Sequence, residues 1–402
     1  MRPVTVCQVC AVEFTYRQFM APLALALDQQ GYQVHAAFTP EPSTQGPGVV
    51  DLGPVQHHPV AIARSASPLA LARSTWQLYR LFRRHRFTVV HVHTPVAAIA
   101  ARLAAAWARI PLVIYTAHGF YFHDRMPRLQ RWLHISLEAL LARLTSELFT
   151  VSREDADLAL RLRFKPAARI HAIGNGVDPV RFSPATPSQR LAQRRRFGLD
   201  PEAVVIGIVA RLVAEKGYGE LCAAFDQLAC RYPQAQLLLC GSRLSSDHAG
   251  SVDTQIASLQ QRYPARVVCT GGLVDPEAAY QAMDVFCLPS WREGLPYTVI
   301  EAMLSGLPVV ATDIRGCREQ VLPEGTGLLV PAVQVQPLAA ALERLLVEPD
   351  DRARWGAAGR VRALELYDQS VVLERQLRLY DRALARLSQG RRRRGWLRCW
   401  RP

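Results

Sequence analysis

Lysine is almost absent from this chain of 402 residues. Among its 48 basic side chains only two are lysines, Lys165 and Lys216, and all the others are arginines. The formal net charge is +14, with an isoelectric point near 9.8. A chain this basic favours polyanionic partners, namely phosphates, anionic lipid or nucleic acid, and charge alone does not choose among them.

Long hydrophobic runs are also missing. No window holds about 18 consecutive apolar residues, the length that a membrane-spanning helix needs. The most apolar stretch, residues 96–116, is interrupted by Arg102 and Arg109. The amino-terminal sequence MRPVTVCQVC leads directly into a predicted strand and lacks the pattern of a secretory signal. We therefore expect a cytoplasmic protein that does not span a membrane.

The nine cysteines do not suggest a disulfide framework, because they are scattered through apolar runs such as LLLCG and VFCLP. Cys7 and Cys10 form one C-x-x-C, but they lie on a predicted buried strand with no second pair to complete a zinc site. We expect reduced, buried thiols. No internal repeat of about 20–50 residues is visible, so the sequence gives no sign of a solenoid.

Short β-branched runs alternate with longer helical patterns along the chain, which is typical of parallel sheets covered by helices on both faces. The alternation stops near a segment rich in Pro, Ser and Arg and then restarts, so we predict an α/β protein of two domains. The expected strands read VTVCQV, VHAAFT, TVVHVH, LVIYT, LFTV and RIHAI before the break, and VVIGIV, QLLLCG, RVVCT, VFCLP, PVVATD and TGLLV after it. The expected division is a first domain at 1–180, a linker at 181–199, a second domain at 200–369, a helix at 370–388 and a basic tail at 389–402.

The helix predicted near the carboxyl terminus has one apolar stripe that must pack on something. Its members recur with a 4-3-4-3 spacing, as expected for one helix face: Leu373, Leu377, Tyr380, Leu384 and Leu387. The tail RRRRGWLRCWRP that follows has no such pattern.

Two glutamates stand eight positions apart in the stretch SWREGLPYTVIEAMLSGLPVV, residues 290–310. A strand precedes this stretch, and Pro296 can start a helix that ends at Gly306. Glu293 then lies in the loop and Glu301 inside the helix. Carboxylates are rarely buried in apolar sequence without partners. We expect these two to accept hydrogen bonds from the vicinal hydroxyls of a ribose or a sugar.

The same helix start suits a phosphate. Free N–H groups and the positive end of the helix dipole lie at residues 294–297, in a loop at the carboxyl end of a strand, where parallel sheets bind ligands. A second segment, IGIVARLVAEKGYGEL, places Arg211 at another strand end and Lys216 five residues on. Two cations at adjacent strand ends suit a diphosphate.

These residues resemble the retaining glycosyltransferases of family 4, which have the two-domain GT-B fold. The matching strings are VARLVAEKG, the CG of LLLCG, IGNGVDPVRFSP, and the run GGLVDPEAAYQAMDVFCLPSWREGLPYTVIEAMLSGLPVVATDIRGCREQV. The E-x7-E signature of that family matches Glu293 and Glu301. The resemblance covers nearly the whole chain and is strongest over 169–330. It implies two Rossmann-like α/β/α domains that face each other across a cleft, with the last helix crossing back to the first domain.

The resemblance also implies roles for individual residues. Glu301 would take the ribose hydroxyls of a nucleotide sugar, and Glu293 would contact the transferred sugar. Arg211 and Lys216 would neutralise the diphosphate as the nucleotide leaves, so that no metal or other cofactor is required. The other donor-binding positions would be Gly294, Leu295, Pro296 and Tyr297 at the helix start, Gly241 in LLLCG, and Leu273 and Val274 beside the base.

The first domain offers a second set of candidates. His118, in AHG, follows a predicted strand, and the family places there a cleft histidine that contacts the donor sugar; a purely structural histidine is the alternative. Many family members carry a glycine-rich turn after the first strand, but here the sequence reads CAVEFTYRQFM, without glycine. This departure puts a phosphate contact in doubt, and we expect Phe14, Thr15 and Arg17 to contact the acceptor instead.

Two patterns that suggest metal binding are interpreted as structural. Asp155 and Asp157 form an Asp-x-Asp at a predicted helix start, where acidic side chains favour the helix dipole. His91 and His93 lie on one face of a predicted strand. Because no cluster of carboxylates or cysteines accompanies them, we favour core packing or cleft lining over a metal site.

Two amphipathic stretches interleave arginine with large apolar residues: WQLYRLFRRHRF at 76–87 and HDRMPRLQRWLH at 123–134. They indicate either ordinary solvated helix faces or docking on anionic lipid. With the basic tail and its Trp396 and Trp400, they lead us to expect peripheral association with the inner face of the cell membrane.

We thus predict a retaining hexosyl or N-acetylhexosaminyl transferase that uses a nucleotide sugar, by preference a UDP-sugar. Its acceptor would be a lipid-linked sugar or glycan in the synthesis of a cell-envelope polysaccharide. One alternative is a UDP-sugar epimerase of the same architecture, although E-x7-E is not its signature. The other is a non-catalytic basic binding protein such as an RNA binder, although the sequence holds no RNA-module motif.

Overall fold

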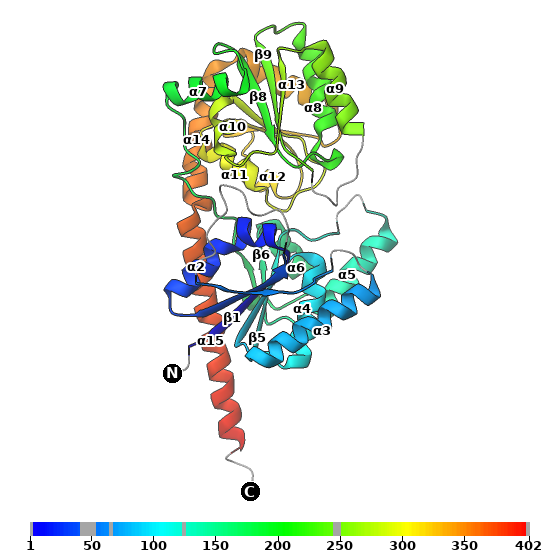
Figure 1. Ribbon diagram of the computed structural model, residues 1–402, viewed down its shortest axis with the longest axis vertical. Coiled ribbons are helices and arrows are strands. Elements are labelled where there is room, and N and C mark those ends of the chain that lie inside the picture. The colour runs from blue at the N-terminus through cyan, green and yellow to red at the C-terminus, as the bar shows by residue number, and fades with distance from the viewer. Residues whose placement is uncertain (1–2, 41–53, 64–66, 123–125, 244–250, 399–402) are drawn as a thin grey trace. The chain divides into compact units, whose positions relative to one another are not determined.

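The chain forms two compact units in the computed structural model. The model describes residues 3–40, 54–63, 67–122, 126–243 and 251–398, with the side chains of these ranges except at 251 and 390–398. One unit contains Met1–Gly174 and Val372–Pro402, and the other contains Asn175–Val371. Each is built on one parallel sheet with helices on both faces, as the alternating sequence pattern predicts (Figure 1).

The sheet of the first unit has the strand order β3-β2-β1-β4-β5-β6-β7. Its strands are β1 (Thr5–Val12), β2 (Gln33–Thr39), β3 (Gln56–Pro59), β4 (Val89–His93), β5 (Leu112–Ala117), β6 (Glu147–Thr150) and β7 (Ile170–Ala172). The strand β3 was not predicted, because its sequence QHHP has no β-branched residue. It pairs with β2 alone, at the edge of the sheet, where polar residues and proline are tolerated.

The helices of the first unit cover both faces of this sheet. They are α1 (Glu13–Thr15), a π-helical turn (Tyr16–Met20), α2 (Ala21–Gln29), α3 (Pro68–His85), α4 (Pro95–Ala108), α5 (Arg128–Ala142), α6 (Arg153–Arg161) and a short 3-10 turn (Ala167–Arg169). One core contains Leu78 and Phe82 of α3 with the alanine-rich face of α4. Another core, on the other face of the sheet, contains the apolar residues of α2.

The strand β1 shows how the sequence period builds these two cores. Cys7 and Val9 point into the core under α3 and α4, while Val6 and Cys10 point into the core under α2. The two cysteines of the C-x-x-C therefore face opposite sides of the sheet. Burial raises the pKa of the Cys7 thiol. Two sulfurs on opposite faces do not bind one metal. The expectation of buried thiols holds for these two, but it was wrong for Cys230 and Cys269, which are exposed.

The last helix, α15 (Gln369–Arg398), belongs to the first unit from Val372 onward. Its predicted stripe packs on the core under α2: Tyr380 is buried there, and Leu373, Leu377, Leu384 and Leu387 lie against it. The carboxyl-terminal helix thus returns to the first unit, as predicted. It continues ten residues beyond the expected end at 388, so most of the predicted basic tail is helical. The side chains of that tail, including Trp396 and Trp400, lie outside the described residues.

The sheet of the second unit has the order β10-β9-β8-β11-β12-β13. Its strands are β8 (Val204–Val209), β9 (Ala235–Cys240), β10 (Val267–Gly271), β11 (Val285–Leu288), β12 (Val309–Thr312) and β13 (Gly327–Val330). The helices are α7 (Pro187–Phe197), a 3-10 turn (Ala214–Lys216), α8 (Tyr218–Ala229), α9 (Ser251–Arg262), α10 (Glu277–Ala282), α11 (Tyr297–Leu304), α12 (Cys317–Gln320), α13 (Val335–Val347) and α14 (Pro349–Tyr367).

The segment 181–199, predicted as a linker, contains the helix α7. Thr186 and Gln189 form a capping box at its start. Its arginines then bind acidic groups of the second unit: Arg194 donates to Asp284 at 2.5 Å, and Arg196 pairs with Asp275. The arginines that suggested an exposed linker therefore attach this helix to the second unit, which begins at Asn175.

Candidate active site

The sheet of the second unit reverses its strand order between β8 and β11. On one side of β8 follow β9 and β10, and on the other side follow β11, β12 and β13. Neighbouring strands are parallel throughout. Sheets of this kind bind ligands beyond the carboxyl ends of their strands, at the point of reversal. Arg211 and Lys216 follow β8 and Glu293 follows β11, so the structure brings these predicted residues to that point.

Lys216 and Glu293 form an ion pair between the two loops. The Nζ atom of Lys216 lies 2.6 Å from Oε1 of Glu293, and the side chains are only 18% and 9% exposed. The loops come this close because Gly217 has no side chain. A Cβ there would lie 2.1 Å from the carbonyl oxygen of Pro289, and its φ of +77° also favours glycine. In an ion pair this sheltered from water, each charge is compensated by the other. A polyanionic ligand can take the place of Glu293 as the partner of Lys216.

Another carboxylate, that of Glu215 in the loop after β8, lies between two arginines. It accepts a hydrogen bond from Arg211 at 3.5 Å and one from Arg292 at 3.4 Å. These contacts are long and partly exposed, so they contribute little to stability. A shorter hydrogen bond joins the loops after β8 and β11: the backbone N–H of Trp291 donates to the carbonyl of Glu215 at 2.8 Å. A guanidinium group can bind a phosphate through two parallel N–H donors.

Glu301 lies in the second turn of α11 and is only 7% exposed. The hydroxyl of Tyr280 donates to its Oε2 at 2.6 Å. Burial raises the pKa of the Glu301 carboxyl to about 7, although the Tyr280 hydrogen bond and the charge of Arg181 oppose the shift. One carboxylate oxygen thus has a protein donor. A ligand that offers further hydroxyl donors stabilises the charged form.

The turn at residues 294–297 is held in place at the start of α11. The amide of Asn175 donates to the carbonyl of Leu295 at 2.6 Å, and that of Gln320 donates to the carbonyl of Pro296 at 3.0 Å. Gly316 crosses so closely that a Cβ on it would lie 2.3 Å from the carbonyl oxygen of Gly294. Pro296 is the residue before the helix, and no side chain caps the helix there. A rigid helix start without a side-chain cap is suited to bind an anion.

The remaining predicted donor positions follow β9 and β10. Gly241 comes directly after β9, and a Cβ on it would lie 1.8 Å from the carbonyl oxygen of Ala210. This glycine therefore allows the loop after β8 to approach. Leu273 and Val274 come two and three residues after β10, and Val274 is 69% exposed. An exposed valine beside the carboxyl edge of the sheet offers an apolar surface to a flat ring.

In the first unit, His118 directly follows β5 and is partly buried. Its Nε2 lies 3.1 Å from Nδ1 of His93, which ends β4. Burial lowers the pKa of His118 to about 4, so the ring is neutral at physiological pH. A neutral imidazole held by a second histidine can exchange hydrogen bonds with a sugar hydroxyl but carries no charge.

The predicted acceptor residues follow β1 in the same unit. The chain turns directly into α1 and the π-helical turn, where many relatives have a glycine-rich turn. Phe14 is 47% exposed, Thr15 is partly buried, and Arg17 donates to Glu13 at 2.8 Å. An exposed aromatic ring and a guanidinium group on one short turn are side chains that suit a sugar or a lipid diphosphate.

Two family models together match most of the chain. The model Glycosyltransferase Family 4 matches residues 18–181, and the model Glycosyl transferases group 1 matches residues 189–362. The chain is also 30% identical over 373 residues to EpsD of Bacillus subtilis (strain 168), which is provisionally named a glycosyltransferase; the match covers 91% of this chain and 93% of EpsD. The chain belongs to glycosyltransferase family 4.

Two further comparisons bear on this family 4 transferase. It is 28% identical over 287 residues to an Escherichia coli enzyme named UDP-Gal:alpha-D-GlcNAc-diphosphoundecaprenol alpha-1,3-galactosyltransferase, with 71% of this chain and 73% of that protein covered. The solved structure of HepE from Anabaena in complex with UDP-glucose has a TM-score of 0.77 at 18% identity, covering 94% of this chain and 99% of that one. The transferase therefore has the GT-B fold, and it acts in polysaccharide or glycolipid synthesis.

The structure gives contacts for one residue of each pattern interpreted as structural. Both ring nitrogens of His91 are engaged, one with the hydroxyl of Tyr380 at 2.6 Å and one with that of Thr116 at 2.7 Å. This is core packing, one of the two roles favoured for the histidine pair. Asp155 lies in the first turn of α6, where its backbone N–H donates to the capping hydroxyl of Ser152 at 3.1 Å.

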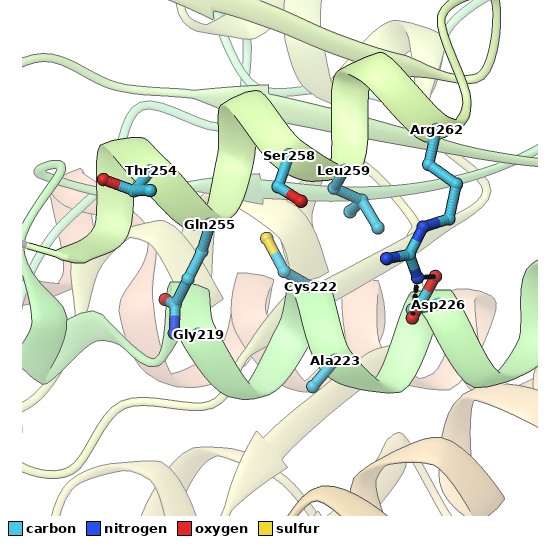
Figure 2. A pocket seen from close by; sticks show the side chains of 9 residues that line it. All are labelled: Gly219, Cys222, Ala223, Asp226, Thr254, Gln255, Ser258, Leu259 and Arg262. Atoms are coloured by element: carbon cyan, nitrogen blue, oxygen red, sulfur yellow. Dashed lines mark hydrogen bonds and ion pairs between the residues drawn. The ribbon is translucent and has the colours of Figure 1, made fainter.

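A pocket elsewhere in the second unit of the transferase contains none of the predicted site residues. It has a volume of about 370 Å³ and lies between α8 and α9 (Figure 2). Cys222 points into it, and burial raises the pKa of its thiol to about 12, which makes it a poor nucleophile. Arg262 and Asp226 close one end with a salt bridge of 2.5 Å. We assign this pocket no part in the reaction.

Sequence reasoning missed several residues that shape the site. Tyr280, Asn175 and Gln320 fix Glu301 and the turn before α11 by hydrogen bonds, and Glu215 and Trp291 join the loops after β8 and β11. No periodic or local motif marks these contacts, because the partners are 21 to 120 positions apart in the chain. All five lie inside strings that match the family, Asn175 in IGNGVDPVRFSP for example, but the strings do not show which residues pair.

Proposed function

We propose that this glycosyltransferase moves a sugar from a UDP-sugar to a lipid-linked or glycan acceptor with retention of the anomeric configuration. The observation that carries the proposal is the group formed by Lys216, Glu293 and Arg211 at the reversal point of the second sheet, beside the uncapped start of α11. Cations, backbone donors and a sheltered carboxylate at one strand edge match the diphosphate and the sugar of such a donor.

The proposed roles follow from what each side chain can offer. Lys216 and Arg211 would bind the diphosphate and stabilise the charge that grows on it as the sugar leaves. Glu293, freed from Lys216 by the diphosphate, would accept hydrogen bonds from the transferred sugar. Glu301 would accept the ribose hydroxyls, and in doing so would gain donors for its buried carboxylate. The apolar surface at Val274 would border the base.

The proposed chemical step needs no separate base. The acceptor hydroxyl attacks the anomeric carbon from the side that the diphosphate leaves, so the new carbon–oxygen bond forms on the face where the old one breaks. The proton of the acceptor hydroxyl passes to the departing phosphate oxygen. With cations from the protein at the diphosphate, the step would need no bound metal. His118 would contact the donor sugar, and Phe14, Thr15 and Arg17 would contact the acceptor.

The choice of a UDP-sugar and a lipid-linked acceptor rests on the relatives. The name of the Escherichia coli relative gives UDP-Gal as its donor and a diphosphoundecaprenol-linked sugar as its acceptor, and the Anabaena structure contains UDP-glucose. Neither sugar is assigned to this chain. The proposal names the uridine nucleotide, the class of acceptor and the class of transferred sugar, which is a hexosyl or N-acetylhexosaminyl group.

We further propose that the enzyme lies on the inner face of the cell membrane. Among the described residues, no helix is both long and apolar enough to cross one. However, α5 exposes a row of large apolar side chains next to its arginines: Leu129, Trp132, Leu133, Leu137 and Leu140. Exposed apolar and basic side chains on one helix are typical of an element that enters a lipid interface.

The other predicted lipid-binding stretch, residues 76–87, is only partly available. Leu78, Phe82 and Phe87 of this stretch are buried in the core, so its apolar face packs inside the first unit. Trp76 remains 56% exposed and stacks with Tyr79. We therefore assign the main lipid contact to α5 and give residues 76–87 a supporting role through their arginines. Residues 123–125 of the α5 stretch lie outside the described residues.

Incubation with labelled UDP-sugars and a bacterial lipid extract tests the proposed function. Labelled sugar appearing in the lipid or glycan fraction supports transfer. Conversion of the UDP-sugar into an isomer would instead support the epimerase, and neither product with any nucleotide sugar would favour a binding protein. The controls are Glu293→Gln, which should lose transfer, and Lys165→Ala, which removes the only other lysine and should not.

A further inference from the structure

Three histidines gather at the edge of the sheet in the first unit. His35 lies on β2, His58 on the edge strand β3, and His85 is the last residue of α3. His35 pairs with Gln56 in the register of the two strands, and His58 is two residues beyond Gln56, so both histidines lie on the same face. One ring nitrogen from each of the three lies within 4.8 Å of the other two.

The rings are close enough to share one ligand. Nδ1 of His35 lies 2.9 Å from Nε2 of His58, and the centre of the His85 ring lies 4.7 Å from that of His58. Nitrogens bound to one tetrahedral zinc ion at about 2.0–2.1 Å are separated by roughly 3.3 Å. The three nitrogens lie within 4.8 Å of one another, so closing by at most about 1.5 Å brings them to the spacing of ligands around one ion.

The protonation state of the three rings also suits a metal. Burial, and then the closeness of the other two rings, lower the pKa of His35 to about 4, and burial lowers the pKa of His58 and His85 as well. All three are neutral at physiological pH, which is the form that binds a metal. Within the described part of the chain, neither ring nitrogen of His85 has a hydrogen-bond partner.

We propose that His35, His58 and His85 bind one divalent transition-metal ion, with Zn²⁺ as the expected occupant. Imidazole binds Zn²⁺, Cu²⁺, Ni²⁺ and Co²⁺ and has little preference for Mg²⁺ or Ca²⁺. Arg84, whose charge lowers the pKa of His58 and His85, opposes any bound cation, so the affinity comes from coordinate bonds. The negative end of the α3 dipole, at His85, acts in favour of the ion.

The position of the cluster indicates a structural metal. His35 lies in the amino-terminal half of β2, His85 ends α3 ahead of β4, and His58 lies within β3 opposite Ala37, so none of the three follows the carboxyl end of a strand. Phe14 and His118, by contrast, follow the carboxyl ends of β1 and β5. A metal would attach the edge strand β3, which pairs with β2 alone, to both β2 and α3. Phe87 packs against the cluster: its ring stacks on that of His85 and makes an edge-to-face contact with that of His35.

The test uses full-length protein whose purification tag has been removed and whose metals have been stripped by a chelator. Titration with Co²⁺ should give a visible absorption band of tetrahedral nitrogen coordination that saturates at one ion per chain, without the band of a thiolate–cobalt bond. Zn²⁺ should displace the Co²⁺ and raise the melting temperature, because a ligand of the folded state stabilises it by mass action. Mg²⁺ should do neither.

Variants decide which residues hold the ion. His85→Gln and His58→Gln should each weaken zinc binding by at least about tenfold and abolish the rise in melting temperature, since losing even an indirect partner of a ligand costs about that much. His57→Gln is the matched control: this neighbour is exposed, contacts Tyr16 and Phe38 instead, and should bind as the wild type does. Circular dichroism of the metal-free variants checks folding.

Two results would overturn the proposal. One is the absence of any stoichiometric Co²⁺ or Zn²⁺ binding by the stripped wild type. The other is binding that persists unchanged in folded His85→Gln and His58→Gln, which would place the metal elsewhere, for example at the exposed cysteines Cys230 and Cys269. If His85→Gln fails to fold, His58→Gln and the cobalt spectrum of the wild type remain decisive.

Discussion

The ammonium group of Lys216 lies 2.6 Å from the carboxylate of Glu293, although the two residues are 77 positions apart in the chain. The pair joins the loop after β8 to the loop after β11, at the point where the strand order reverses. Both side chains are mostly shielded from water, so each depends on the other for charge compensation. A bound diphosphate would take over Lys216 and leave Glu293 free for the sugar, which couples donor binding to the preparation of the site.

Lys216→Ala and Arg211→Ala should each lower kcat by about 100-fold while changing KM much less, because the charge on the leaving diphosphate is greatest in the transition state. Steady-state kinetics with the preferred donor measures both constants. Lys165→Ala serves as the control for losing a lysine. If KM rises and kcat holds, the two cations serve only in ground-state binding.

Glu301→Gln should weaken binding of the free nucleotide by about 1–3 kcal/mol, because a charged acceptor of the ribose hydroxyls is replaced by a neutral one. Calorimetry with UDP measures the loss. Glu293→Gln provides the contrast: the diphosphate no longer competes with this carboxylate for Lys216, so the affinity for UDP should hold or rise rather than fall. Equal affinity of wild type and Glu301→Gln for UDP contradicts the ribose assignment.

The same substitution should stabilise the empty enzyme at alkaline pH. The pKa of Glu301 rises from 4.5 to about 7 on folding, so between these values the folded protein binds more protons than the unfolded one. Stability therefore falls as pH rises through this window, by up to about 3 kcal/mol for a shift of this size. Glu301→Gln removes this loss. In thermal unfolding, the variant should have a higher melting temperature than the wild type at pH 8, and the difference should disappear near pH 4. An increase of equal size at both pH values would mean that the ionisation of Glu301 is not its cause.

Transfer should survive a strong chelator. The protein's own cations lie at the strand ends where the diphosphate is proposed to bind, and Asp155, the buried member of the Asp-x-Asp pair, lies in a capped helix turn instead. Initial rates measured with and without chelator should agree, even where the chelator lowers the melting temperature by removing an ion from the histidine cluster. Loss of transfer that one particular metal restores would refute this part of the account.

The enzyme should float with anionic vesicles and not with neutral ones, and salt should weaken the binding, because exposed charges are screened over about 8–10 Å at physiological ionic strength. Trp132→Ala with Leu133→Ala should reduce flotation through α5, while a chain ending at Ser388 tests the basic tail separately. Trp107→Ala, an exposed tryptophan on α4, is the control for losing an aromatic side chain. No flotation of the full chain at low salt would exclude the membrane assignment.

The fold was predictable because it depends on periodic patterns. The alternation of residues in β1 between two cores, and the stripe from Leu373 to Leu387, are properties of short segments. The edge strand β3 was not predicted because QHHP has no such pattern. The helix α7 was not predicted because its arginines pair with residues distant in the sequence, such as Asp284. A sequence shows which residues are charged, but pairing depends on the completed fold.

The candidate site was predictable to a different extent. Glu293, Glu301, Arg211 and Lys216 stood out through family strings, and the structure places three of them at the reversal point. Their partners could not be foreseen: Tyr280 binds Glu301 from α10, and Glu215 lies between two arginines. The histidine cluster was missed for the same reason, since His35, His58 and His85 meet only when the sheet edge and the end of α3 form.

The most direct measurement of the central claim is slow donor hydrolysis across a panel of UDP-, GDP- and ADP-sugars, with magnetic resonance of the freshly released sugar before its anomers equilibrate. The account predicts release of UDP from a UDP-sugar, a sugar that first appears in the anomeric configuration of the donor, and loss of this activity in Lys216→Ala but not in Lys165→Ala. A sugar released with inverted configuration would contradict the proposed step. Hydrolysis undiminished in Lys216→Ala would contradict the proposed site.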